Sequence, residues 1–387
     1  MGSVSHCAGS PVRGLAASLL AVVLSAGAGC VGELPDVVDG NVGLDPKLFP
    51  NQRIREEPND SFADPLEVIF DASGRGHLAG SISAPDDLDV YALGPLVAGD
   101  RLIVDVGTHN SGLDAAVAVF DAAGRLVFEN DDRNYDLRQY DPFINNVIRH
   151  DSEVYYLGVA SAPLGVPGSR TGAYEVLVTV VQGGEVPVPS PQVVVLDFNG
   201  GTIRIAGEGI YTVDTFDTRD ISPAYAGLTE AVRRHVVATV LENYEGVALD
   251  VRVVPGDALP SDGSYSTVLF GGGNPEAFGI AQNIDPYNAN HSDSAVIFTD
   301  MFTPARFGRT LTAAELGTAI GNVASHELGH LLGLNHVDNI YDVMDTTGDP
   351  STFYLDQDFL NSGLHSTIFP IGTQDGFLLL LEALGTL

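Results

Sequence analysis

Short stretches in the first half of the chain alternate apolar and polar residues, and turns rich in glycine, aspartate and asparagine separate them. A period of two predicts strands that bury one face. Short strands between such turns are typical of an all-β sandwich, and the clearest examples are residues 102–106, 116–120, 154–159 and 174–178. We therefore expect residues 57–181 to form a β-sandwich.

The rest of the chain contains both the period of about 3.6 residues that is typical of helices and the period of two that is typical of strands. An amphipathic helix is predicted at residues 228–244, and buried strands are predicted at 193–197, 248–254, 267–270 and 295–299. Residues 192–387 are therefore expected to form an α+β domain, which makes the chain multidomain. Glycine and proline concentrate in residues 182–191, which is typical of a linker between domains.

A further helix is predicted to begin at Thr312. Thr312 and Glu315 have the spacing of a capping box, in which each side chain bonds the backbone amide of the other residue. At about 100° per residue, the apolar side of this helix continues to Glu327 and His330. These two candidate functional residues therefore lie on the side of the helix that faces the core.

The first 29 residues have the pattern of an export signal, in which Arg13 precedes a short apolar run and then small residues. The run is too short to span a membrane. Residues 30–56 show no periodicity, and we expect a tether there. The small residues before Cys30 resemble the lipobox of bacterial lipoproteins. This resemblance implies lipidation of Cys30 in a bacterial cell envelope, with free secretion as the alternative.

The chain is strongly acidic, with 51 Asp and Glu against 18 Lys and Arg and a formal net charge of −33. This charge repels phosphate and argues against a nucleic-acid partner. The lipid at Cys30 would be the one contact of the protein with a membrane. The second cysteine, Cys7, lies in the signal peptide, so we expect no disulfide framework.

Residues 326–336 fit the pattern H-E-x-x-H-x-x-G-x-x-H at every fixed position. On a helix, His326 and His330 project from one face about a turn apart and can share a metal ion. Gly333 can end the helix in a left-handed conformation, which turns the chain back and brings His336 in as a third ligand. Three protein ligands leave the fourth position to water, which is typical of catalytic zinc.

Glu327 follows the first histidine and is the predicted general base. Zinc lowers the pKa of its water towards ~7, and Glu327 can pass the proton to the leaving amine. The predicted activity is zinc-dependent cleavage of protein or peptide substrates. One alternative is a surface binding lipoprotein that uses the β-sandwich, with the protease fold as a scaffold. Another is zinc-dependent hydrolysis of a non-protein amide. Glu327 favours an enzyme because a base serves catalysis rather than zinc binding.

The motif resembles that of the metzincin zinc endopeptidases over about residues 190–387. In that family a methionine turn lies beneath the zinc, and the matching residue is Met344, eight residues after His336, as in matrixins. The resemblance implies a twisted mixed sheet with an active-site helix. Thr346 stands where astacins and serralysins have a zinc-binding tyrosine, so that contact is not implied. A cysteine switch is excluded, since no cysteine follows Cys30.

Residues 57–181 resemble the bacterial pre-peptidase C-terminal domain, through segments 57–61, 86–91 and 155–159 in that order. That module usually follows the peptidase, whereas here it precedes it. The resemblance implies calcium binding by Glu57, Asn59, Asp60, Asp86 and Asp89. Oxygen ligands of this kind suit calcium. The alternative is an acidic turn in which aspartates cap backbone amides.

Overall fold

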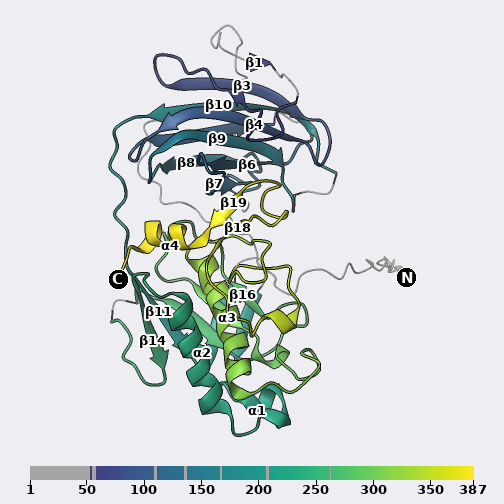
Figure 1. The fold of residues 1–387 in the computed structure, drawn as a ribbon, viewed down its shortest axis with the longest axis vertical. Helices are drawn as coiled ribbons and strands as arrows, with labels where there is room; N and C mark the ends of the chain where they lie inside the picture. The colour runs from purple at the N-terminus through teal and green to yellow at the C-terminus, as the bar shows by residue number, and fades with distance from the viewer. Residues whose placement is uncertain are drawn as a thin grey trace, which may run out of the picture.

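A computed structural model of the chain describes residues 53–54, 58–108, 111–134, 137–165, 168–205, 209–261 and 263–387. These residues form a sheet-rich molecule with a β unit at one end and an α/β unit at the other (Figure 1). The predicted signal peptide, the tether and Cys30 lie outside the described residues. In the described part of the chain, no helix is long and apolar enough to cross a membrane.

The β unit consists of two five-stranded sheets, ordered β1-β3-β10-β5-β8 and β2-β4-β9-β6-β7. Alternating apolar residues such as Val104 and Val176 are buried in the core that the two sheets share. The strands are β1 (Arg53–Ile54), β2 (Leu66–Glu67), β3 (Arg75–Ile82), β4 (Leu88–Leu96), β5 (Arg101–Gly107), β6 (Ala115–Phe120), β7 (Leu126–Asn130), β8 (Phe143–Val147), β9 (Ser152–Ser161) and β10 (Gly172–Val181).

The α/β unit contains a mixed sheet of order β14-β11-β15-β17-β16. Its first four strands are parallel, and the edge strand β16 runs antiparallel to β17. The strands are β11 (Gln192–Asp197), β14 (Leu249–Val254), β15 (Ser266–Phe270), β16 (Gly279–Ala281) and β17 (Ser294–Ile297), and two hairpins are formed by β12 (Gly201–Ile205) with β13 (Gly209–Val213) and by β18 (Asn361–Gly363) with β19 (Thr373–Asp375).

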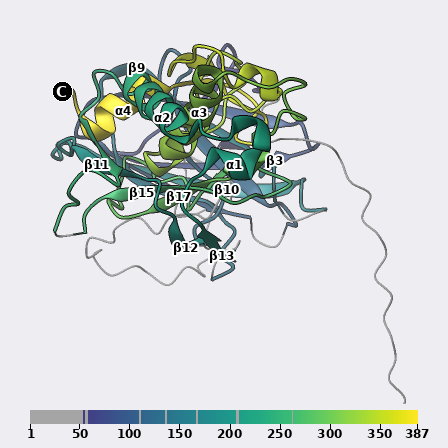
Figure 2. The same cartoon turned by 90° about the horizontal axis from the view of Figure 1, so that it is seen from below.

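Helices cover one face of this sheet, and the β12–β13 hairpin covers the other (Figure 2). The longest helix, α3, begins as predicted: the Thr312 hydroxyl accepts a hydrogen bond from the Glu315 amide, and the Glu315 carboxylate accepts one from the Thr312 amide. The α-helices are α1 (Thr218–Ile221), α2 (Thr229–Asn243), α3 (Ala313–Leu331) and α4 (Gly376–Leu384), with 3-10 turns at Pro223–Tyr225, Thr299–Met301 and Pro350–Thr352.

The C-terminal elements β18, β19 and α4 lie between the two units (Figure 1). Ile368 and Phe369 pack on the outer face of the sandwich, where Phe369 lies 5.6 Å from Phe120 between ring centroids. Strand β6 is therefore buried on both faces, which explains why its sequence is apolar throughout rather than alternating.

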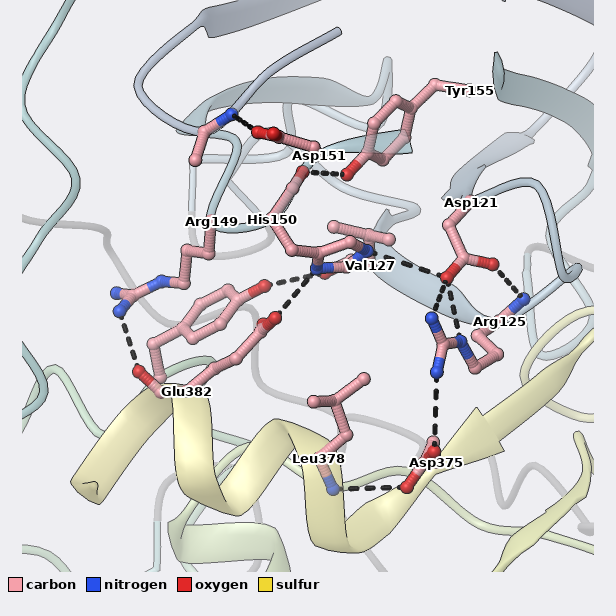
Figure 3. Close-up of polar contacts among 12 residues, drawn as sticks. Asp121, Arg125, Val127, Arg149, His150, Asp151, Tyr155, Asp375, Leu378 and Glu382 are labelled. Atoms are coloured by element: carbon pink, nitrogen blue, oxygen red, sulfur yellow. Dashed lines mark hydrogen bonds and ion pairs between the residues drawn. The ribbon is translucent and has the colours of Figure 1, made fainter. Parts of the chain in front are cut away.

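Charged residues join the sandwich to α4 and to the residue that precedes it (Figure 3). His150 lies between two carboxylates, 2.7 Å from Glu382 and 3.5 Å from Asp121. A guanidinium nitrogen of Arg125 is 3.6 Å from Asp375, which also caps the N-terminus of α4. The contacts with Asp121 and Glu382 raise the pKa of His150 from 6.5 to about 9.

Replacing His150 by glutamine should change how stability depends on pH. Because the pKa of His150 is raised on folding, its stabilising effect is complete below about 6.5 and disappears as the pH rises through about 9. We expect the Tm of the wild type to fall more steeply than that of His150→Gln across this range in differential scanning calorimetry. His235→Gln, at an exposed position of α2, is the control and should follow the wild type. Parallel plots of Tm against pH for all three proteins would contradict the raised pKa of His150.

Candidate metal centre

Helix α3 and the turn after it bring His326, His330 and His336 together in the interior. Each offers one nitrogen, and these three atoms lie within 4.8 Å of one another. All three residues are buried, and burial lowers the pKa of His326 to about 4 and the pKa values of the other two well below 6.5. The imidazoles are therefore neutral, which is the form that binds a metal.

Backbone carbonyls orient two of the rings. The Nδ1 atom of His326 is 2.8 Å from the carbonyl oxygen of Val343, and that of His330 is 2.8 Å from the carbonyl oxygen of Leu334. A carbonyl oxygen only accepts, so each Nδ1 carries the proton and each Nε2 carries a lone pair.

These two Nε2 atoms face each other at 3.1 Å. Two lone pairs at this distance repel unless a cation lies near both of them. The Nε2 atom of His336 is buried and has no hydrogen-bond partner among the described residues. Three neutral imidazole nitrogens with free lone pairs fit zinc in chemistry and in number.

A sharp turn at Gly333 separates the second histidine from the third. Gly333 has φ of 97°, and a Cβ there would lie 2.9 Å from backbone atoms of Asp285 and Tyr287. The amide of Leu334 donates to the carbonyl of Gly329 at 2.9 Å, which closes the end of the helix. The conformation and the lack of space both require glycine here.

Glu327 is fully buried, and neither carboxylate oxygen has a hydrogen-bond partner in the described structure. Strand β16 lies against it, since a Cβ on Gly279 would be 2.6 Å from Oε1 of Glu327. Burial raises the pKa of this carboxyl well above its ordinary value, and the nearby backbone amide of Ala281 opposes this with a smaller effect. A nearby dication would act in the opposite direction and favour the carboxylate.

Met344 packs against α3 beside the histidines. Its side chain is buried, and a Cβ on Gly329 would lie 2.5 Å from its sulfur. The preceding residue, Val343, accepts the hydrogen bond from His326. The segment that carries the methionine therefore also orients a candidate ligand.

Four of the five predicted calcium ligands lie in the described part of the chain, and they differ in burial. Asp89 is buried and accepts a hydrogen bond from the hydroxyl of Tyr174, whereas Asp60 and Asp86 are exposed. Asn59 is buried, with its Nδ2 3.4 Å from the carbonyl oxygen of Val90. Glu57 lies outside the described residues. Within the described ranges, the three histidines are the one cluster of His, Cys, Asp or Glu suited to a metal, and calcium binding stays a prediction.

The sequence reasoning missed the groups that hold the ligands. The carbonyls of Leu334 and Val343 carry no side-chain signal because every residue has one. Gln374 hydrogen-bonds the backbone of Asn335 from 39 positions away. No local pattern could identify such a residue.

No protein-family model matches the chain, and no curated protein matches its sequence. Several solved structures resemble part of it. Archaemetzincin from Methanopyrus kandleri is 15% identical, with a TM-score of 0.27, and the match covers 50% of this chain and 95% of that one.

Two further structures match the chain in part. The pre-peptidase C-terminal domain of a collagenase from Bacillus anthracis is 14% identical, with a TM-score of 0.23, over 33% of this chain and 100% of that one. A periplasmic inhibitor of g-type lysozyme from Aeromonas hydrophila is 17% identical, with a TM-score of 0.24, over 30% and 96%. Similarity at this level assigns neither a family nor an activity.

Replacing Gly333 by alanine should weaken zinc binding. A side chain in a left-handed conformation costs about 1–2 kcal/mol, and relaxation of the turn would shift His336. We expect zinc affinity, measured by competition with a chromophoric chelator, to fall on the order of tenfold. Gly363→Ala is the control because a Cβ there meets no atom within 4 Å. Equal zinc affinity in the two variants would show that this turn does not set the position of His336.

Proposed function

We propose that this protein is a zinc-dependent endopeptidase in which His326, His330 and His336 bind the metal and Glu327 is the general base. One observation carries the proposal. Three buried imidazoles with converging nitrogens are carried by α3 and the turn after it, and the same helix carries the buried carboxyl group of Glu327, which forms no side-chain hydrogen bond among the described residues. A structural zinc site would be closed by a fourth protein ligand.

Zinc supplies Lewis acidity when bound, which polarises a peptide carbonyl and makes water more acidic. The chain's own part is to orient the imidazoles and to move a proton. The carbonyls of Val343 and Leu334 hold two of the rings with Nε2 free. Glu327 would accept the proton of the attacking water and deliver it to the nitrogen of the leaving amine.

The burial of Glu327 favours an enzyme over the alternative in which the protease fold is only a scaffold. Burying the Glu327 carboxyl group with so few polar contacts costs free energy, so a protein that only captures a ligand gains nothing from Glu327. In a site closed to bulk water, each charge acts more strongly on the reacting atoms. Because Glu327 is fully buried, a peptide can reach it only if the covering segments move apart.

Export and anchoring belong to the same proposal. A signal peptide at residues 1–29 and a lipid on Cys30 would place the enzyme in a bacterial cell envelope, where protein and peptide substrates are accessible. Free secretion is the alternative. Mass spectrometry of the mature N-terminus separates the two, since a lipid adds its mass to a peptide that begins at Cys30. Calcium binding by the sandwich is tested by comparing the Tm of the protein with and without calcium.

Glu327→Gln should strongly slow cleavage while zinc stays bound. Glutamine keeps the shape but cannot take a proton, so the cleavage rate should fall by about 10²–10⁴-fold. The measurement is cleavage of a denatured protein by the zinc-loaded chain, with zinc content determined in parallel. Glu230→Gln, at an exposed position of α2, is the control and should cleave like the wild type.

The outcomes separate the candidate functions. Cleavage by Glu327→Gln at the wild-type rate would remove the general base from the mechanism. A zinc-loaded wild type that cleaves no protein would favour the binding lipoprotein, unless it hydrolyses a non-protein amide.

A further inference from the structure

The side chain of Gln374 forms two hydrogen bonds to a single residue of the metal-binding segment. Its Oε1 accepts from the amide of Asn335 at 2.7 Å, and its Nε2 donates to the carbonyl of the same residue at 2.8 Å. Gln374 is 1% exposed, and Asn335 is buried as well. Both polar groups of the Asn335 backbone are thus satisfied by one carboxamide in a dry environment.

Asn335 directly precedes His336, whose ring is held differently from the other two. The rings of His326 and His330 are each fixed by a backbone carbonyl. Within the described structure, the ring of His336 forms no hydrogen bond to the protein, and its Nε2 is buried and unpartnered. The position of this third ligand therefore depends on its backbone.

Three contacts hold that backbone. The carbonyl of His336 accepts from the amide of His365 at 3.0 Å, and the amide of Val337 donates to the carbonyl of Met344 at 3.0 Å. Gln374 supplies the third contact on the side nearest to Gly333. It is the one side chain among them, so it alone can be tested directly by substitution.

We propose that Gln374 is a positioning residue for His336 and thereby for zinc, an inference that rests on the proposed zinc function. It touches neither the metal nor the substrate in this role. Residues that orient metal ligands from outside the coordination sphere commonly change metal affinity about 10- to 100-fold when replaced.

The β-sandwich holds Gln374 on both sides. The amide of Thr373 donates to the carbonyl of Gly124 at 2.9 Å. Asp375 pairs with Arg125 at 3.6 Å, as Figure 3 shows. Since Gln374 lies between these two contacts, the sandwich is connected to the third zinc ligand through β19. In this arrangement the sandwich is a structural part of the metal site.

The experiment measures metal affinity in the full-length chain, by zinc competition with a chromophoric chelator and by the visible absorption of bound cobalt(II). Gln374→Leu removes both hydrogen bonds, and we expect zinc affinity to fall about 10- to 100-fold with a changed cobalt spectrum. Gln374→Glu keeps the acceptor for the Asn335 amide, so its affinity should lie between leucine and wild type. This milder variant keeps the test valid if leucine prevents folding.

Asn130→Leu is the matched control. Its carboxamide also bonds the backbone twice, accepting from the amide of Phe143 at 2.8 Å and donating to the carbonyl of Asp132 at 3.0 Å, but it belongs to the sandwich. It should lower the Tm and leave zinc affinity and the cobalt spectrum unchanged. Wild-type affinity in both Gln374 variants would overturn the proposal. Arg125→Gln should weaken zinc binding less than Gln374→Leu, and unchanged affinity would overturn the connection to the sandwich.

These outcomes are distinct from failure of the proposed function. A wild type that binds zinc but cleaves nothing would remove the peptidase assignment, while the comparison of metal affinities would still decide the role of Gln374. A wild type that binds no zinc would overturn both.

Discussion

Bringing three imidazole nitrogens with free lone pairs together inside a protein costs free energy. The lone pairs repel one another when no cation or proton lies between them, and they have lost their hydrogen bonds to water. Much of the α/β unit is organised to impose this arrangement. Helix α3 aligns two rings, carbonyls fix their tautomers, and a glycine turn returns the chain for the third. A bound zinc ion would repay that cost, so metal affinity and local folding are expected to be coupled.

The support for this site extends well beyond the motif. Met344 fills the space that Gly329 leaves open, the residue before it bonds the first histidine, and the C-terminal hairpin bonds the residue before the third. That hairpin lies against the sandwich, so residues of both units contribute to one arrangement. A sandwich that only tethered the α/β unit would need none of these contacts.

Sequence patterns predicted the elements whose burial follows one simple period. Helix α3 begins at the predicted cap, and strands β11, β14, β15 and β17 lie where apolar runs indicated them. Strand β16 was missed because Gly279–Ala281 is too short to show a period. Helix α4 was not predicted either, since its run of leucines has little polar contrast and its buried residues Leu380, Ala383 and Leu384 pack into the core of the α/β unit.

The sequence by itself determined the chemistry at the centre: three imidazoles, one carboxyl and a glycine at fixed spacing, because a helix and a turn convert that spacing into geometry locally. Only the tertiary structure decided what surrounds them. The contact of Gln374 with Asn335, the closure of β16 over Glu327 and the placement of His150 between Asp121 and Glu382 join residues far apart in the chain. Such pairings depend on how whole sheets and helices pack, which no local pattern encodes.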